Sequence, residues 1–441
     1  MEKTLFKNFI KYASLNILGM MGLSLYILAD TYFVSKAMGP TGLASLNLSI
    51  SIYSVIHGIG LMIGIGGASR FSILKSQNEI GKASIVFSTA IKTGIIIGML
   101  LAILGVFGTE HLALALGADS ATLALTQTYL TTILFFAMLF IVNNILLAFV
   151  RNDNNPKLSM IAMLVGSFSN VILDYILIFP LDMGMFGAAF ATTLAPLISI
   201  FVLLLHFIDK KNALAFWKSK LQWNLIPDIL SLGSSAFIIE VSSAVVLITF
   251  NLVILGIEGN LGVAAYGIVA NLALVGIAVF TGLSQGIQPL ISKHYGLKEH
   301  AETRKVRQFS VLTSVAIAMI IYIFILLFSD SIIQIFNSEN NMEIARIAEI
   351  GLKVYFIGFL FAGVNIVTAI FLSATENPKD AFFITIARGL VIMVPLVLIL
   401  SNILGMMGVW LAFVVTEFLV TLLGIYLKEK KKEIVYVKQA A

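Results

Sequence analysis

Residues 187–208 read GAAFATTLAPLISIFVLLLHFI, 22 positions without a single Lys, Arg, Asp or Glu. As a helix this stretch would be about 33 Å long, which matches the ~30 Å hydrocarbon core of a bilayer. The whole chain has the same character: 59% of its 441 residues are hydrophobic and 12% are charged, against about a quarter charged in a soluble domain. The composition excludes a soluble enzyme, a disordered chain and a coiled coil, and predicts an all-α, multi-pass membrane protein.

Comparable apolar windows recur along the chain and predict twelve spans. They lie near residues 12–34, 48–69, 84–107, 124–149, 158–180, 187–208, 230–256, 264–290, 308–330, 350–373, 381–402 and 405–427. With the N-terminus inside, 23 Lys and Arg residues fall in inner segments and three in outer ones. This bias predicts that both termini are cytoplasmic and that the protein lies in the cell (inner or plasma) membrane.

The second half of the chain repeats the first at an offset of about 221 residues. Gly184-Met-Phe-Gly187 matches Gly405-Met-Met-Gly408, and Asn155-Pro-Lys matches Asn377-Pro-Lys. Six spans per copy is an even number, so both copies cross the membrane in the same sense and are expected to be related by a pseudo-two-fold axis along its normal. The predicted units are an N-lobe bundle (1–208), a cytoplasmic linker (209–224) and a C-lobe bundle with a basic tail (225–441).

Few charged residues lie inside the spans, and each costs about 2.5–3.5 kcal/mol on insertion scales, so they mark candidate sites. Asp30 lies in the first span, Asn170 and Asp174 lie one helical turn apart in the fifth, and Thr192 lies early in the sixth. These oxygens predict a pocket that takes up a proton or holds a small hard cation such as sodium. The alternative is that each carboxylate faces a water-filled vestibule or pairs with a base.

The remaining charges within the spans have more ordinary interpretations. Glu240 could be a counter-charge for a cationic substrate, a second protonation site, or a carboxylate in an aqueous cavity. Glu417 is expected to be a structural partner, with Arg388 or Lys379 in conceivable reach, and His57 a satisfied histidine at a helix interface. Lys92 and Arg388 are expected to extend toward the inner face.

The two six-helix copies, Ala29-Asp30-Thr31, the Asn170–Asp174 pair with its Gly184/Gly187 turn, and Glu240 together resemble the multidrug and toxic compound extrusion family, nearest its MepA-like branch with the DinF-like branch close behind. The resemblance implies two lobes in a V that export drugs in exchange for protons or sodium. It also implies an N-lobe cation site at the positions of Asp30, Asn170, Asp174 and Thr192. A second-lobe site would use Glu240 and an acid on the tenth span, but no acid occurs between Lys353 and Glu376. Some relatives bend the first span at a proline; here a bend would have to use Gly19 and Gly22.

The sequence therefore predicts a secondary-active antiporter for amphipathic, cationic organic compounds, driven by H⁺ or Na⁺. It is expected to act as a monomer in the bilayer, without cofactor, enzymatic activity or nucleic-acid partner. The absence of cysteine excludes disulfides and thiolate metal sites. Two alternatives remain: a lipid-linked oligosaccharide flippase of the same superfamily, which would want cations facing its cavity, and a membrane-embedded protein that does not transport.

Overall fold

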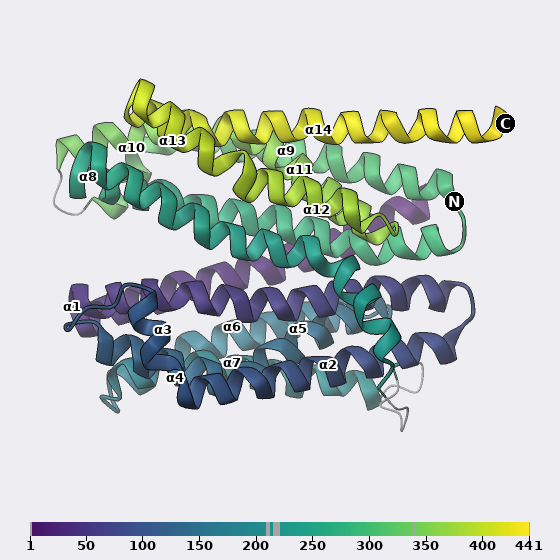
Figure 1. The fold of residues 1–441 in the computed structure, drawn as a ribbon, viewed down its shortest axis with the longest axis horizontal. Coiled ribbons are helices and arrows are strands. Elements are labelled where there is room, and N and C mark those ends of the chain that lie inside the picture. Colours follow the sequence, from purple (N-terminus) through teal and green to yellow (C-terminus); the bar gives the residue numbers. More distant parts are fainter. Residues whose placement is uncertain (1, 209–211, 215–220, 338–340, 441) are drawn as a thin grey trace.

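The computed structural model describes residues 2–208, 212–214, 221–337 and 341–440, with side chains up to residue 427. Every regular element in this part of the chain is helical, and the long helices run nearly side by side in two bundles (Figure 1). Most of the predicted linker, at 209–211 and 215–220, lies outside the described residues, as do the side chains of the basic tail.

The N-terminal bundle contains seven α-helices and a closing 3₁₀ turn. They are α1 (Glu2–Ser76), α2 (Ile80–Phe107), α3 (Thr109–Ala115), α4 (Leu123–Phe135), α5 (Ala137–Asn152), α6 (Pro156–Ile178), α7 (Gly184–Leu204) and η1 (Leu205–Ile208). Asn155 begins α6 by accepting a hydrogen bond from the Leu158 amide, and Pro156 occupies the first helical position, where no amide hydrogen is needed.

The C-terminal bundle repeats this plan. Its elements are η2 (Trp223–Leu225), α8 (Ile226–Gly296), α9 (His300–Phe336), α10 (Met342–Tyr355), η3 (Phe356–Gly358), α11 (Phe359–Ala374), α12 (Pro378–Ile386), the π-helical turn η4 (Ala387–Val391), α13 (Met393–Leu404) and α14 (Met406–Ala440). The repeated Asn-Pro-Lys motifs begin corresponding helices, α6 and α12, as the internal repeat predicts.

Two of the helices, α1 and α8, each cross the molecule twice. Gly39 and Gly259 interrupt them with φ of 63°, a left-handed conformation that glycine adopts without a steric penalty, and the chain turns back there (Figure 1). Nine helices in the described part of the chain are long and apolar enough to span a membrane, or ten when the bent pair of α4 and α5 counts as one. Dividing α1 and α8 at their glycines gives twelve crossings, so the predicted span count and two-bundle architecture are confirmed.

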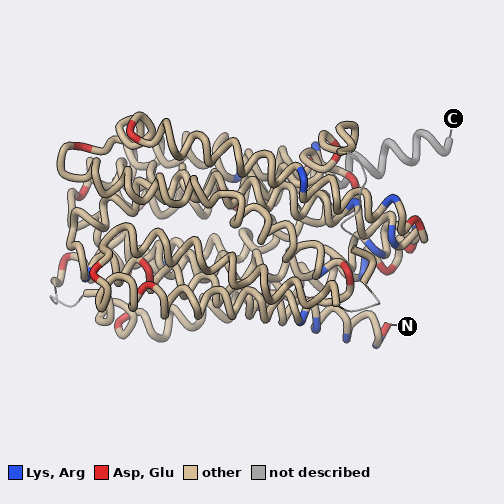
Figure 2. Tube along the Cα trace, turned by 90° about the horizontal axis from the view of Figure 1, so that it is seen from below, with Lys and Arg blue, Asp and Glu red and all other residues tan. Residues whose placement is uncertain are grey.

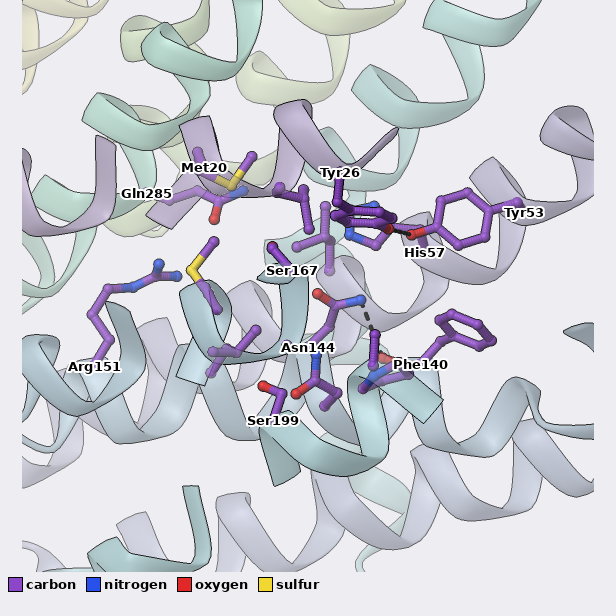
Figure 3. Close-up of a pocket in the computed structure, with 18 residues that line it drawn as sticks. Met20, Tyr26, Tyr53, His57, Phe140, Asn144, Arg151, Ser167, Ser199 and Gln285 are labelled. Carbon is purple, nitrogen blue, oxygen red and sulfur yellow. Dashed lines mark hydrogen bonds between the residues drawn. The ribbon is translucent and has the colours of Figure 1, made fainter. Parts of the chain in front are cut away.

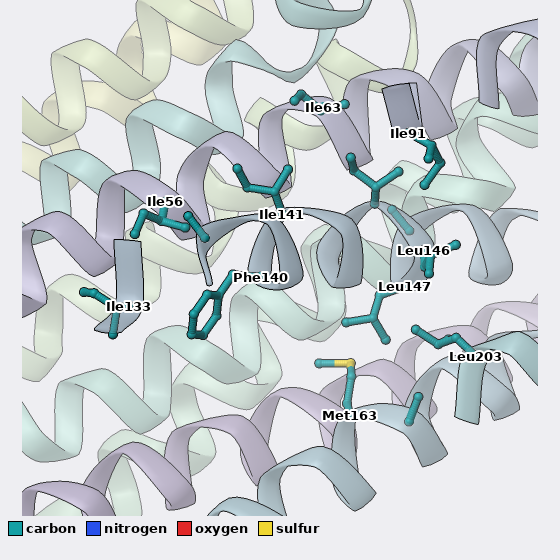
Figure 4. Close-up of a cluster of buried hydrophobic side chains, with 14 of the residues drawn as sticks. Ile56, Ile63, Ile91, Ile133, Phe140, Ile141, Leu146, Leu147, Met163 and Leu203 are labelled. Carbon is teal, nitrogen blue, oxygen red and sulfur yellow. The ribbon is translucent and has the colours of Figure 1, made fainter. Parts of the chain in front are cut away.

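The core of the N-terminal bundle consists of aliphatic and aromatic side chains at the centre of α1, α2, α5, α6 and α7 (Figure 4). Lipid is itself apolar, so bundle stability in a membrane comes from close packing more than from transfer out of water. Glycines make that packing close: a methyl group on Gly64 would lie 2.9 Å from the Asn144 carbonyl oxygen. Gly19 and Gly22 similarly pack against Met163 and Leu164, and α1 shows no break in its helical conformation before Gly39.

The two bundles meet at the end of the molecule that carries the N-terminus and most of the described basic side chains, which we call the inner end (Figure 2). There Asn152 donates to Gln288 at 2.8 Å, Gln288 donates to Ser69 at 2.9 Å, and Asn16 donates to the Gly282 carbonyl at 2.8 Å. Arg70 also pairs with Asp228 at 3.2 Å and with Glu376. The two bundles are therefore in direct contact at the inner end, and the structure is closed there.

Candidate functional site

The two acids predicted to form the site come together in the N-terminal bundle. Asp30 projects from α1 with 6% of its surface exposed, and Asp174 projects from α6 with none. They are near enough to interact electrostatically, and in each the Oδ1 atom has no hydrogen-bond partner. Among the described residues no basic side chain lies within 4.0 Å of either carboxylate, so the alternative that they pair with a base is wrong.

Asn170 and Thr192 complete the oxygen-rich pocket. With its amide nitrogen facing the acid, Asn170 donates to Asp174 Oδ2 at 3.0 Å and accepts from the Thr192 backbone amide at 3.3 Å. The Thr192 hydroxyl donates to the Ala188 carbonyl at 3.0 Å. A buried carboxylate without a counter-charge is unfavourable, so the arrangement favours uptake of a proton or a cation at the two free oxygens.

Three tyrosines adjoin this pocket, and sequence analysis did not single them out. Tyr129 of α4 interacts with Thr192 and electrostatically with both acids. The Tyr26 and Tyr53 hydroxyls lie 2.9 Å apart, and the Tyr53 ring stacks on His57. Tyrosine within a span is common and carries no charge, so no sequence signal distinguishes these from packing residues.

Glu240, on the first segment of α8, faces the N-terminal bundle. Its carboxylate lies 3.4 Å from His57 Nδ1, and the two side chains are 25% and 11% exposed. The prediction that His57 is a satisfied interface histidine is confirmed. Together with the tyrosine contacts, this pair forms a continuous line of polar groups from Tyr26, one turn from Asp30 on α1, to the C-terminal bundle.

Glu417 and Arg388 form a separate ion pair in the C-terminal bundle. Arg388 Nε lies 2.5 Å from Glu417 Oε1, and Asn365 donates to Oε2 at 2.7 Å. The expectation that Glu417 is a structural partner is confirmed. Of the two bases in conceivable reach, Arg388 is the partner, because the fully buried carboxylate requires a counter-charge within the bundle.

A small cavity of about 60 Å³ lies inside the N-terminal bundle (Figure 3). Tyr26, Tyr53 and His57 line it together with Arg151, and Gln285 of α8 reaches it from the other bundle. No group of three or more His, Asp or Glu side chains that could hold a metal occurs in the part of the chain that the structure describes. The oxygen set of Asp30 and Asp174 suits a proton or a weakly held monovalent cation better than a tightly bound metal.

Twelve crossings in two repeated bundles, with two acids buried in one of them and no base beside these acids in the described part of the chain, are typical of a membrane transporter. The chain belongs to the MatE family, a family of transporters whose model matches residues 16–176 and 236–399. This confirms the resemblance read from the sequence motifs.

Curated relatives and solved structures are similar over nearly the whole chain. The multidrug export protein MepA of Staphylococcus saprophyticus is 27% identical over 418 residues, which cover 94% of this chain and 92% of that protein. MepA of Staphylococcus haemolyticus is 27% identical over 97% of this chain and 94% of that protein. An outward-facing multidrug resistance transporter of the MATE family matches with a TM-score of 0.91 at 22% identity, covering 98% of this chain and 96% of that one. A mutant of the Vibrio cholerae MATE transporter VcmN matches with a TM-score of 0.89 at 19% identity over 97% of both chains.

Proposed function

We propose that this protein is a secondary-active multidrug efflux antiporter that exports amphipathic, cationic organic compounds in exchange for H⁺ or Na⁺. The observation that carries the proposal is the pair of buried acids, Asp30 and Asp174, which have one unpartnered oxygen each and no base beside them among the residues that the structure describes. The names of the MepA relatives support the export of drugs. We place the protein in the cell membrane as a monomer, with both termini in the cytoplasm.

In this proposal the coupling ion and the drug favour different arrangements of the two bundles. A proton on Asp30, or a sodium ion held by Asp30, Asp174, Asn170 and Thr192, removes the charge that would otherwise be buried without compensation. The neutralised α1 can then repack against α6, and the drug is released outward while the inner end stays closed. Emptying the ion site to the cytoplasm restores the charge and the affinity for a cationic drug.

Glu240 is the proposed counter-charge for the cationic substrate. Its present partner, His57, lies 3.4 Å away and comes from the opposite bundle. A bound organic cation would take the place of this contact, so drug binding and the separation of the bundles at mid-depth would be linked.

The flippase alternative is less well supported. It requires several cationic side chains free to hold a lipid-linked phosphate between the bundles. Arg388 is engaged by the buried Glu417, and Lys92 has an interaction of its own. Arg151 faces a cavity of only about 60 Å³, which is too small for a lipid-linked oligosaccharide. We therefore retain export of organic cations as the proposed function.

Purified protein in liposomes would test the proposal. Accumulation of a fluorescent cationic dye would be measured under a pH gradient alone, a sodium gradient alone and no gradient. We expect uphill dye transport under one of the two gradients and only equilibration without a gradient. Equal dye movement under all three conditions would reject antiport.

A further inference from the structure

Arg151 lies in the last turn of α5, and only 3% of its surface is exposed. In the sequence it belongs to the basic residues of an inner loop, which would ordinarily face water. The fold instead encloses it within the N-terminal bundle, where its guanidinium points from α5 toward the cavity (Figure 3). An enclosed arginine needs either a counter-charge or a ligand, because a buried unpaired charge is strongly destabilising.

The structure supplies no counter-charge for Arg151. Its Nη1 donates to the neutral Asn16 Oδ1, its Nε has no hydrogen-bond partner, and among the described residues no carboxylate lies within 4.0 Å. Three other arginines with buried or half-buried guanidinium groups are satisfied differently: Arg70 and Arg388 have carboxylates, and Arg307 lies over the Phe371 ring.

The nearest acid along the chain, Asp153, already has its negative charge balanced by other groups. It accepts hydrogen bonds from Lys75, from His206 Nε2 at 2.8 Å and from the Ala213 amide at 2.8 Å. Burial raises the pKa of Asp153, but the hydrogen bonds from His206 and Lys75 outweigh it and hold the pKa below its ordinary value. This carboxylate is therefore ionised and fully engaged, which leaves the charge on Arg151 uncompensated.

The cavity next to Arg151 also has polar atoms without partners. The Ser167 and Ser199 hydroxyls line it and have no hydrogen-bond partner, and Gln285 lines it from α8. The guanidinium and the two hydroxyls can each donate a hydrogen bond to an anion. Asn143 Oδ1, an acceptor without a partner, also lines the cavity and can accept from a bound water. A volume of about 60 Å³ holds a carboxylate-sized group or a few waters, but not a whole drug molecule.

We propose that the Arg151 end of this cavity binds a monoanionic group of the size of a carboxylate. The group is either a small free anion or the carboxylate of a zwitterionic substrate whose cationic part lies farther out. Only the second source rests on the proposed export function. Because Gln285 closes the cavity from the opposite bundle and Asn16 bonds to Gly282, the bound anion would sit at the junction that opens and closes during transport.

The first arm of the test measures binding without transport. Thermal unfolding of the purified full-length protein would be followed at constant ionic strength while formate replaces gluconate, an anion too large for the cavity. We expect formate to raise the unfolding temperature saturably, by at least about 2 °C. Arg151→Gln should abolish this response, whereas the control Arg307→Gln should keep it.

A second variant keeps the test decisive if Arg151→Gln does not fold. Asn16→Asp would place a carboxylate on the atom that Arg151 already contacts, and would thereby supply the missing counter-charge from within the chain. We expect Asn16→Asp to respond no further to formate, whereas the control Asn16→Ala, which loses the same hydrogen bond to Gly282 without supplying a charge, should keep the response. An unchanged formate response in Arg151→Gln or Asn16→Asp, or no response in the wild-type protein, would overturn the anion site.

The second arm identifies the source of the anion. Binding of a zwitterionic dye and of its methyl ester would be compared in wild-type protein and in Arg151→Gln, or in Asn16→Asp. A preference of the wild-type protein for the carboxylate of about tenfold or more, lost in the variant, assigns the site to substrate. Equal affinity for dye and ester, with the formate response intact, assigns it to a free anion. Failure of dye transport alone would count against the proposed export function and not against the anion site.

Discussion

Replacing Gly233 with alanine should open the inner end of the molecule. Gly233 of α8 lies against α1 so closely that a methyl group would be 1.8 Å from the Met62 carbonyl oxygen. The reciprocal contact is as tight, since a methyl group on Gly66 would be 2.0 Å from the Ile229 carbonyl. A carbon and a carbonyl oxygen need about 3.3 Å, so the two backbones would have to separate by about 1.5 Å.

This separation would break the hydrogen bonds that hold the bundles together nearby. Asn152, Gln288 and Asn16 make three contacts of 2.8–2.9 Å across the junction, and each contributes about 0.5–1.5 kcal/mol. Their combined loss, about 1.5–4.5 kcal/mol, would shift the closed-to-open equilibrium by roughly 10- to 2,000-fold. Gly256→Ala on the same helix is the matched control, because a methyl group there meets nothing within 4 Å.

The chain has no cysteine, so spin labels can be attached at two chosen positions without a background. With labels on cysteines at the exposed inner positions 82 and 300, electron–electron distance measurements should show a short distance in the wild-type protein and in Gly256→Ala. Gly233→Ala should populate a longer distance. An unchanged distribution in Gly233→Ala would refute the view that this helix contact holds the inner end closed.

Three further predictions concern acids within the membrane-spanning helices. Asp174→Ala should remove the pH or sodium dependence of transport more than drug binding; lost affinity with intact ion dependence in a binding assay would reverse this assignment. Glu240→Gln should weaken binding of a monocationic dye about 5- to 150-fold more than binding of a neutral analogue, while an equal loss with altered pH dependence would place Glu240 in ion coupling. Glu417→Gln should lower the unfolding temperature, because it leaves Arg388 without a counter-charge at a cost of about 3–5 kcal/mol, and Arg388→Met in the same chain should restore it; thermal unfolding of both variants checks this.

Sequence analysis was most informative where a single local property decides the structure. Twenty apolar residues must form a spanning helix because lipid cannot satisfy backbone hydrogen bonds, so the twelve crossings and the repeat could be predicted. The acids of the site could be predicted because a carboxylate within the bilayer raises the free energy of insertion. Asp30 and Asp174 were therefore expected either to be functional or to be paired.

Pairing between distant segments could not be read from the sequence. Arg388 and Glu417 are 29 residues apart, and whether they meet depends on how η4 and α14 pack. Arg151 looked like one of many residues in a basic inner loop, and only the enclosing helices show that it is buried. The turns at Gly39 and Gly259 fold α1 and α8 back on themselves. The contacts that these helices then make depend on side-chain packing that no local sequence pattern encodes.

The central claim is that the Asp30–Asp174 pocket couples an ion gradient to export, and Asp30→Asn tests it most directly. Asparagine is close in shape to aspartic acid and removes a buried charge, so this variant should fold. Like the protein with a protonated Asp30, it should bind a cationic dye more weakly than the wild-type protein does. The control is Glu110→Gln, an exposed acid at the start of α3. In liposomes under the driving gradient, we predict that Asp30→Asn equilibrates dye without concentrating it, while Glu110→Gln concentrates dye like the wild-type protein. Uphill dye accumulation by purified Asp30→Asn at the wild-type rate would contradict the account.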